Sequence, residues 1–174
     1  NSQDDFLDPM RGSGTFLSEA YMISRNMPAG IKREKFSFMN WKNFNFSLWN
    51  SVLKTAKDAI VETSANIYGY DINPDAVSLS KSNMYKIDRA NKVKIIAADF
   101  FESKAFSDKG IIISNPPYGT RIRLDDAKSF YKRIGDKLKF GYPGYTAWII
   151  SSDLGAIKFI GMKPERKIPL FNGQ

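Results

Sequence analysis

Four consecutive residues are the best candidates for chemistry in this chain: Asn115, Pro116, Pro117 and Tyr118. They directly follow the apolar residues 110–114, and two prolines end such a buried strand rigidly. The side-chain oxygen of Asn115 and the carbonyl of Pro116 can accept hydrogen bonds from an amino group on a base. Those bonds would localise the nitrogen lone pair for attack on a methyl donor, and the rigid prolines would preorganise the acceptors. Tyr118 can stack on a base that has left its helix; the alternative for the motif is a chance turn.

A glycine-rich segment lies near the start of the chain, where residues 8–15 read Asp-Pro-Met-Arg-Gly-Ser-Gly-Thr. Glycines after a strand let the backbone approach a ligand closely and offer amide donors at the start of a helix. The segment is no P-loop, because no Gly-Lys-Ser/Thr follows. It also differs from the dinucleotide-binding fingerprint, because Leu17 stands where the third glycine is required. Alone, the segment is explained equally well by a tight turn between a strand and a helix.

Two carboxylates, Asp71 and Asp99, each follow a further apolar run. A carboxylate at the end of a strand can accept two hydrogen bonds from a ribose diol, and Asp71 has that setting. Asp99 could accept a hydrogen bond from an adenine amino group while Phe100 packs on the ring. Each residue also has a structural explanation, because Asp71 could cap the following helix and Asp99 could be a cap or turn residue.

The elements that must position these residues alternate between strands and helices. Apolar runs predict strands at residues 4–7, 66–70, 93–98, 110–114 and 147–151. Helices are predicted at residues 16–23, 47–59 and 125–140, with a further helix starting at Asn73 and Pro74 and a final hairpin beginning within residues 167–171. Continuous apolar strands indicate a mostly parallel α/β sheet that is covered on both faces. In such a doubly wound sheet the ligand lies beyond the carboxyl ends of the strands, so Asp8, Asp71, Asp99 and Asn115 should share one edge.

Residues 26–46 are irregular, and five aromatic side chains crowd this stretch: Phe36, Phe38, Trp41, Phe44 and Phe46. Pro28 and Gly30 act as breakers of regular structure. We expect a loop that packs these rings onto the core of the domain. The alternative is a surface on which bases stack.

Composition narrows the classes of partner and of chemistry. The 174 residues fit one domain, and a net charge of +8 with a pI near 9.6 suits a polyanionic partner such as nucleic acid. The chain has no cysteine and no histidine, which excludes disulfides, thiolate chemistry, and the commonest general base and metal ligand. The sequence shows no apolar run of about 18 residues and no secretory signal. We therefore expect a cytoplasmic protein with neither a metal site nor a membrane partner.

Two arginines, Arg121 and Arg123, follow the Asn-Pro-Pro-Tyr motif at alternating positions. Both side chains could face one side of an extended segment. Near a base pocket they would meet the phosphates that flank a flipped nucleotide, and they are our candidates for nucleic-acid binding. The alternative is a solvated loop.

Together these motifs resemble the set found in class I amino-methyltransferases, which have a Rossmann-like fold and use S-adenosylmethionine. The chain is most similar to the THUMP-associated family of ribosomal RNA large-subunit guanine-N2 methyltransferases, whose members are also assigned as N6-adenine-specific DNA methylases. The similarity runs from Phe6 onward and includes segments beyond the shared motifs, namely residues 36–41, 115–119, 134–136, 163–164 and 171–173.

The resemblance implies a fold, a cofactor and a substrate. The fold is a mostly parallel, doubly wound sheet with a C-terminal antiparallel hairpin. The chain would be a catalytic-domain fragment of a protein with an N-terminal THUMP-type RNA-binding domain. The substrate would be guanine in 23S ribosomal RNA, methylated at N2.

The resemblance also implies the S-adenosylmethionine site, in which Asp8 and the glycine-rich loop hold the methionine part, Asp71 the ribose and Asp99 the adenine. The cofactor-binding set is Asp8, Pro9, Met10, Gly12, Ser13, Gly14, Thr15, Asp71, Ile72, Asp99 and Phe100. The chain departs from the family at two positions. Arg11 replaces a residue that is usually small, and Thr120 replaces the acid expected after Gly119.

Three alternatives remain. A DNA adenine-N6 methyltransferase would use the same Asn-Pro-Pro-Tyr chemistry. A dinucleotide-dependent oxidoreductase is opposed by that motif and by the missing third glycine. A non-catalytic RNA-binding module predicts a cleft that Arg11 blocks.

Overall fold

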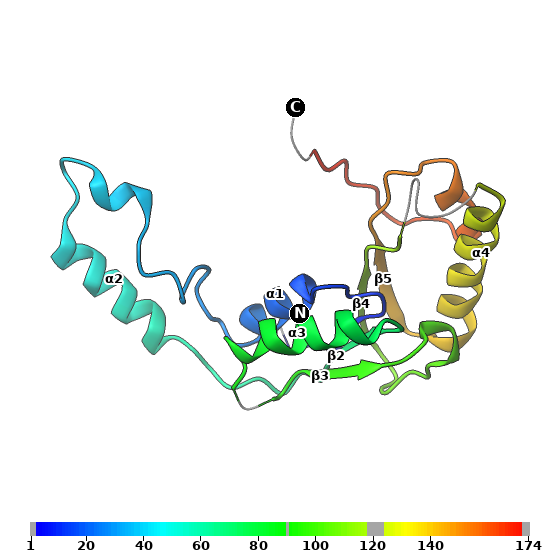
Figure 1. Cartoon of the computed structure of the whole chain (residues 1–174), viewed down its shortest axis with the longest axis horizontal. Coiled ribbons are helices and arrows are strands. Elements are labelled where there is room, and N and C mark those ends of the chain that lie inside the picture. Colours follow the sequence, from blue (N-terminus) through cyan, green and yellow to red (C-terminus); the bar gives the residue numbers. More distant parts are fainter. Residues whose placement is uncertain (1–2, 90, 118–123, 172–174) are drawn as a thin grey trace.

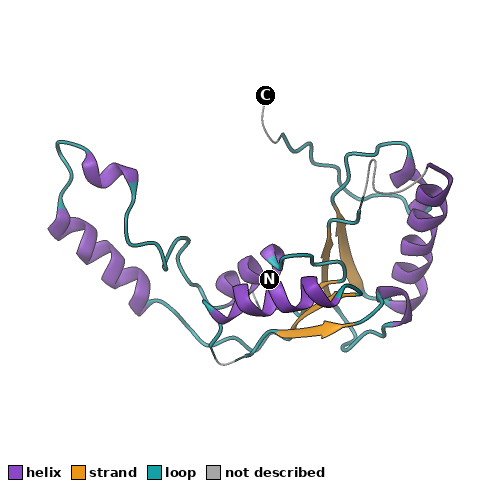
Figure 2. Cartoon of the chain, in the orientation of Figure 1, coloured by secondary structure: helices purple, strands orange, loops and turns teal. Residues whose placement is uncertain are grey.

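Five parallel strands form one sheet in the order β3-β2-β1-β4-β5. Figure 2 draws the strands in orange and the helices around them in purple. The computed structural model describes residues 3–89, 91–117 and 124–171 of the chain. The strands are β1 (Phe6–Asp8), β2 (Ile67–Asp71), β3 (Lys94–Ala97), β4 (Gly110–Ser114) and β5 (Tyr145–Ile149). The chain builds one half of the sheet outward from β1 and then the other, so the strand order reverses between β1 and β4. Ligands of doubly wound sheets bind at such a reversal.

Helices pack on both faces of the sheet because successive side chains of a strand point to opposite sides. Phe6 belongs to the core that α1 (Thr15–Ser24) and α3 (Pro74–Tyr85) share, whereas Leu7 belongs to the core beneath α4 (Leu124–Gly141). The buried members of the first core are Phe6, Leu17, Tyr21, Ile67, Met84 and Val93. Those of the second are Leu7, Tyr70, Phe100, Ile112, Ala127, Tyr131, Ile134, Leu138, Tyr142 and Ala156.

The predicted fold class is confirmed, whereas the predicted C-terminal hairpin is not. Strand β4 has the predicted bounds, and the other strands lie within about two residues of their predicted positions. Residues 161–171 contain no strand in the structure. Instead, a short 3-10 helix, η4 (Ala156–Ile160), packs against α4, where Gly135 leaves room for the carbonyl of Ile160.

The segment between α1 and β2 differs from its prediction. It contains a 3-10 helix, η1 (Ser37–Asn40), and α2 (Phe46–Asp58), and both stand away from the sheet (Figure 1). Asn45 caps α2, since its side chain accepts a hydrogen bond from the backbone N–H of Leu48 at 2.9 Å. No residue of α2 is buried, and the aromatic side chains before it join neither core. The expectation that these rings pack onto the core is therefore wrong.

No helix in the described part of the chain is long and apolar enough to cross a membrane.

Candidate functional site

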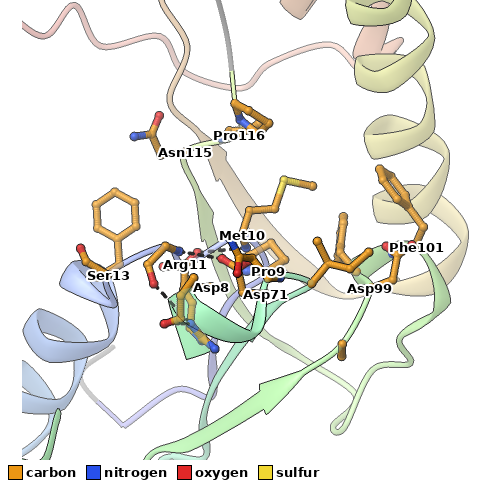
Figure 3. Close-up of a pocket in the computed structure, with 18 of the residues that line it drawn as sticks. Asp8, Pro9, Met10, Arg11, Ser13, Asp71, Asp99, Phe101, Asn115 and Pro116 are labelled. Carbon is orange, nitrogen blue, oxygen red and sulfur yellow. Dashed lines mark hydrogen bonds between the residues drawn. The ribbon is translucent and has the colours of Figure 1, made fainter. Parts of the chain in front are cut away.

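A cavity of about 1110 Å³ opens at the carboxyl edge of the sheet, and the segments after β1, β2, β3 and β4 all reach it (Figure 3). It lies beside the reversal of strand order between β1 and β4. The sequence-predicted residues that line it are Asp8, Pro9, Met10, Gly12, Ser13, Thr15, Asp71, Ile72, Asp99, Phe100, Asn115, Pro116 and Pro117. Four separate chain segments therefore meet in one cavity.

Asp8 ends β1 and lies at the base of the cavity, with a side chain that is 1% exposed. Its Oδ1 accepts a hydrogen bond from the backbone N–H of Met10 at 3.3 Å, whereas Oδ2 is buried without a partner in the described structure. Burial raises the pKa of this carboxyl to about 7, although the hydrogen bond from the N–H of Met10 and the charge of Arg11 both act to lower the pKa. An unpartnered buried carboxylate oxygen is costly, and a cationic ligand group in the cavity would relieve that cost.

Asp71 ends β2 and holds the glycine-rich loop. Its Oδ2 accepts a hydrogen bond from the backbone N–H of Gly12 at 3.0 Å, and its Oδ1 accepts from the N–H of Asn73 at 2.9 Å. The helix cap of α3 is Asn73 and not Asp71, because the Asn73 side chain accepts from the N–H of Asp75. Gly12 has a φ of +51°, which favours glycine, and no atom of the described residues lies within 4 Å of where its Cβ would stand. The loop backbone is therefore open toward the cavity.

Gly14, predicted in the cofactor-binding set, does not line the cavity. It precedes α1 with a φ of +83°, and a Cβ there would lie 3.0 Å from Cβ of Ser80 in α3. Its backbone N–H donates to the carbonyl of Arg11 at 2.9 Å. Gly14 thus shapes the loop and permits close packing of α1 on α3.

Arg11 runs beneath the glycine-rich loop and does not block the cavity. Its guanidinium donates to the carbonyl of Ala76 in α3 at 3.1 Å and to that of Gly12 at 3.3 Å. Gly69 gives it room, since a Cβ at that position would lie 2.5 Å from Cδ of Arg11. Burial lowers the pKa of the guanidinium, and the nearby charges of Asp71 and Asp8 raise it. The blocked cleft that a non-catalytic RNA-binding module predicts is not found.

Asp99 and the two phenylalanines that follow it form a turn after β3. Asp99 caps the 3-10 helix η2 (Phe100–Glu102), because its Oδ1 accepts from the N–H of Phe101 at 2.8 Å. The ring of Phe100 is 3% exposed and stacks on Tyr142 in the core. Phe101 is only half-buried, so it is the more accessible of the two rings in the cavity lining. Asp99 is therefore both a turn residue and a lining residue.

Asn115 and Pro116 follow β4 and stand apart from the carboxylates Asp8, Asp71 and Asp99 in the close-up view (Figure 3). The Asn115 side chain is exposed and makes no hydrogen bond within residues 3–89, 91–117 and 124–171, whereas Pro116 is buried. The amide of Asn115 is thus available to a ligand. Tyr118, Thr120, Arg121 and Arg123 lie outside the described residues.

Sequence reasoning missed several lining residues, of which Arg133 and Phe130 of α4 are the most informative. The guanidinium of Arg133 lies 3.9 Å from the ring centroid of Phe101, and Phe130 meets the same ring edge-on at 5.7 Å. Only the packing of α4 beside η2 brings these side chains to the cavity, so no local pattern could have identified them. The remaining missed residues are Arg11, Phe16, Asn73, Ala76, Ala98 and Phe101.

The cavity thus offers complementary groups for a cationic nucleoside derivative. A buried carboxylate lies at its base, a second carboxylate is fixed by backbone amides, and a third lies beside an accessible aromatic ring. An exposed amide stands at the end of β4. This donor and acceptor set fits S-adenosylmethionine.

Comparison with known proteins agrees with this arrangement. The model of the RMKL-like methyltransferase domain family matches residues 1–174. A Synechocystis protein named "Putative RNA methyltransferase" is 36% identical over 95% of this chain, which spans 44% of that protein. The ribosomal RNA large subunit methyltransferase K/L of Shewanella frigidimarina is 32% identical over 96% of this chain, which spans 24% of it. The chain therefore spans less than half of these relatives.

Two solved structures share the fold over nearly the whole chain. One, described as "SMU.472, a putative methyltransferase complexed with SAH", has a TM-score of 0.89 at 29% identity over 99% of this chain and 46% of its own. The other, from Listeria monocytogenes, is described as "a predicted N6-adenine-specific DNA methylase". It has a TM-score of 0.84 at 25% identity and covers 97% of this chain and 44% of its own. The resemblance seen in the sequence is confirmed, and so is S-adenosylmethionine as the cofactor.

Proposed function

The chain belongs to the RMKL-like methyltransferase domain family, and we propose that it methylates an exocyclic amino group of a base in RNA, with guanine N2 of 23S ribosomal RNA as the target. The observation that carries this proposal is the position of Asn115 and Pro116 in the same cavity as Asp8, Asp71 and Asp99. An acceptor pair for an amino group thereby shares one cavity with the groups that suit the cofactor.

Bound S-adenosylmethionine supplies an electrophilic methyl group on a sulfonium. Asp8 would bind the cationic methionine part, because its Oδ2 has no partner among the described residues and burial favours neutralisation of its charge. Asp71 and Ile72 would hold the ribose. Asp99 and the accessible ring of Phe101 would hold the adenine. Gly12 and the other residues of the glycine-rich loop keep the backbone close to the cofactor.

The target amino group would donate hydrogen bonds to Oδ1 of Asn115 and to the carbonyl of Pro116. Both bonds strengthen as the nitrogen becomes tetrahedral, so they stabilise the transition state more than the bound substrate. This difference lowers the barrier to methyl transfer. Pro116 is buried and Pro117 half-buried, which fixes the direction of the acceptors. After transfer the positively charged nitrogen is acidic enough to release its proton to water without a strong base, consistent with a chain that lacks histidine. Tyr118 would stack on the base.

Three observations support RNA over DNA. The Synechocystis and Shewanella relatives carry RNA-directed names. The sequence offers no candidate helix-turn-helix for reading a duplex major groove. An enzyme that acts on one structured RNA site can use RNA shape together with an accessory RNA-binding domain such as the expected THUMP-type domain. We further propose that Arg121 and Arg123 bind the phosphates beside the target base.

The test is transfer of labelled methyl from S-adenosylmethionine to 23S ribosomal RNA that lacks its own modifications. Nucleoside mass spectrometry should find the label in N2-methylguanosine. The N6-adenine name of the Listeria neighbour motivates the second candidate, a DNA adenine methyltransferase. Label that appeared only as N6-methyladenine in DNA would overturn the RNA proposal and support that candidate.

A further inference from the structure

The segment from residue 31 to residue 58, hereafter the aromatic arm, contains η1 and α2 and projects beyond the sheet (Figures 1 and 2). None of its residues is buried. Because the six aromatic side chains of the arm lie away from both cores, packing of the domain does not explain them. The base-stacking surface is the alternative that remains.

The rings of the aromatic arm pack on one another. Phe38 is central, with ring centroids of Phe36 and Trp49 each 5.2 Å away and that of Phe44 at 5.8 Å. This internal packing supports the arm but leaves two large rings open to solvent. Trp41 is 68% exposed and Phe46 is 64% exposed.

The aromatic arm is also strongly basic. It contains six cationic side chains and two carboxylates, Glu34 and Asp58. Its net charge is therefore +4, half of the +8 of the whole chain. The cations are Lys32, Arg33, Lys35, Lys42, Lys54 and Lys57, and all six are exposed. Arg33 lies over the ring of Phe36 at 5.0 Å, so cationic and aromatic groups share one surface.

We propose that the aromatic arm binds a single-stranded segment of the RNA substrate outside the catalytic cavity. This inference rests on the proposed action on RNA. Exposed rings offer stacking surfaces to bases, and lysines between them neutralise phosphates, which is how proteins bind single strands with little sequence preference. A second copy docked arm to arm would bring two charges of +4 together, so the charge favours a polyanion over self-association.

The test measures the affinity of the full chain for a fluorescent single-stranded RNA of about 20 nucleotides at several salt concentrations. Trp41→Ala should weaken binding about 10-fold, as expected for the loss of one base–aromatic stack, and Trp41→Phe should retain most of it. The triple variant Lys42→Ala, Lys54→Ala and Lys57→Ala should reduce the slope of log K against log salt by about 2.

A matched control changes three exposed lysines outside the arm, namely Lys109→Ala, Lys139→Ala and Lys158→Ala. This control should leave the salt slope much closer to that of the unchanged protein. All variants should keep their affinity for S-adenosylhomocysteine, because no arm residue lines the cavity. Retained cofactor affinity separates a loss of RNA contacts from general misfolding.

Two results would overturn the proposal. If the unchanged protein methylates RNA while the arm variants bind it equally well, the arm has no role in RNA binding, although the proposed function stands. If Leu48→Asp and Val52→Asp convert a dimer into a monomer, as measured by light scattering, without altering RNA affinity, the arm is a surface for a second copy. A protein that methylates no RNA at all would instead refute the proposed function.

Discussion

The backbone N–H of Gly12 donates a hydrogen bond of 3.0 Å to Oδ2 of Asp71, which joins two loops that are 59 residues apart in the chain. Oδ1 of the same carboxylate accepts from the N–H of Asn73 at 2.9 Å. An ionised carboxylate offers about four acceptor sites, so each oxygen can still accept from a further donor. Asp71 can therefore fix the glycine-rich loop and bind a ribose diol at the same time.

Replacement of Asp71 by alanine should weaken the binding of S-adenosylhomocysteine by about 1–3 kcal/mol or more, because the variant loses the proposed ribose contact and leaves the N–H of Gly12 unpaired. Isothermal titration calorimetry measures the change. Asp75→Ala is a suitable control, since Asp75 lies in the first turn of α3 but does not line the cavity. Equal affinities of the Asp71 variant and the unchanged protein would remove Asp71 from the cofactor site.

Asn115→Ala should lower turnover by at least about 100-fold, the effect typical of losing one preorganised transition-state hydrogen bond. Affinity for S-adenosylhomocysteine should stay nearly the same, because the Asn115 side chain makes no hydrogen bond to the rest of the described cavity. Single-turnover methylation of RNA and calorimetry together separate the two effects. A variant that retained most of its turnover number would contradict the proposed mechanism.

Sequence predicted those parts of the fold that local chemistry determines. Strand β4 has its predicted bounds because its apolar residues lie between a glycine and the Asn-Pro-Pro sequence. Strand β5 begins two residues earlier than predicted, after a turn in which Gly144 has a φ of +87° and approaches the carbonyl of Asp108. That close approach is a tertiary contact, so the apolar pattern of residues 147–151 could not reveal it.

Dependence on tertiary contacts, which a local sequence pattern does not reveal, also explains the errors around the site. The cavity residues at strand ends were predictable because parallel strands share a carboxyl edge. Arg133 was not, because it meets Phe101 only when α4 packs beside η2. The aromatic arm was misjudged because composition alone does not distinguish rings that pack on a core from rings that pack on one another, such as Phe44 and Phe46 at 4.6 Å.

The raised pKa of Asp8 predicts that stability and cofactor affinity depend on pH in opposite directions. Burial raises this pKa from its ordinary value of 3.8 to about 7 in the folded protein. A raised folded pKa contributes stability that is present at low pH and is lost as the pH rises through about 7. The loss amounts to at most about 4 kcal/mol, since one pKa unit corresponds to about 1.4 kcal/mol. The cationic cofactor should favour the ionised carboxylate, so its affinity should increase over the same range.

Asp8→Asn tests both effects, because it removes the titrating group and keeps a similar shape. Urea denaturation between pH 5 and about 8 should show a smaller loss of stability in the variant than in the unchanged protein. Calorimetry with S-adenosylmethionine should show weaker binding without the rise in affinity near pH 7. An identical pH dependence of the two proteins would mean that Asp8 is not the titrating group.

Gly69→Ala should destabilise the glycine-rich loop through Arg11. A Cβ at position 69 would lie 2.4 Å from Cδ1 of Leu17 and 2.5 Å from Cδ of Arg11, so both side chains must shift. Overpacking of this kind costs about 1–3 kcal/mol, which for a domain of this size lowers the melting temperature by roughly 2–4 °C per kcal/mol. Displacement of Arg11 would also disturb its hydrogen bond to the carbonyl of Ala76, which ties the loop to α3.

The control for this prediction is a double-mutant cycle with Arg11→Ala, which removes one of the two clashes. Gly69→Ala should cost less in the Arg11→Ala background, with a coupling of at least about 0.5 kcal/mol, because the two residues are in direct contact. Thermal unfolding of the four proteins, with and without S-adenosylhomocysteine, measures the coupling and its effect on the cavity. Strictly additive changes would show that the side chain of Arg11 does not occupy the space that Gly69 leaves beneath the loop.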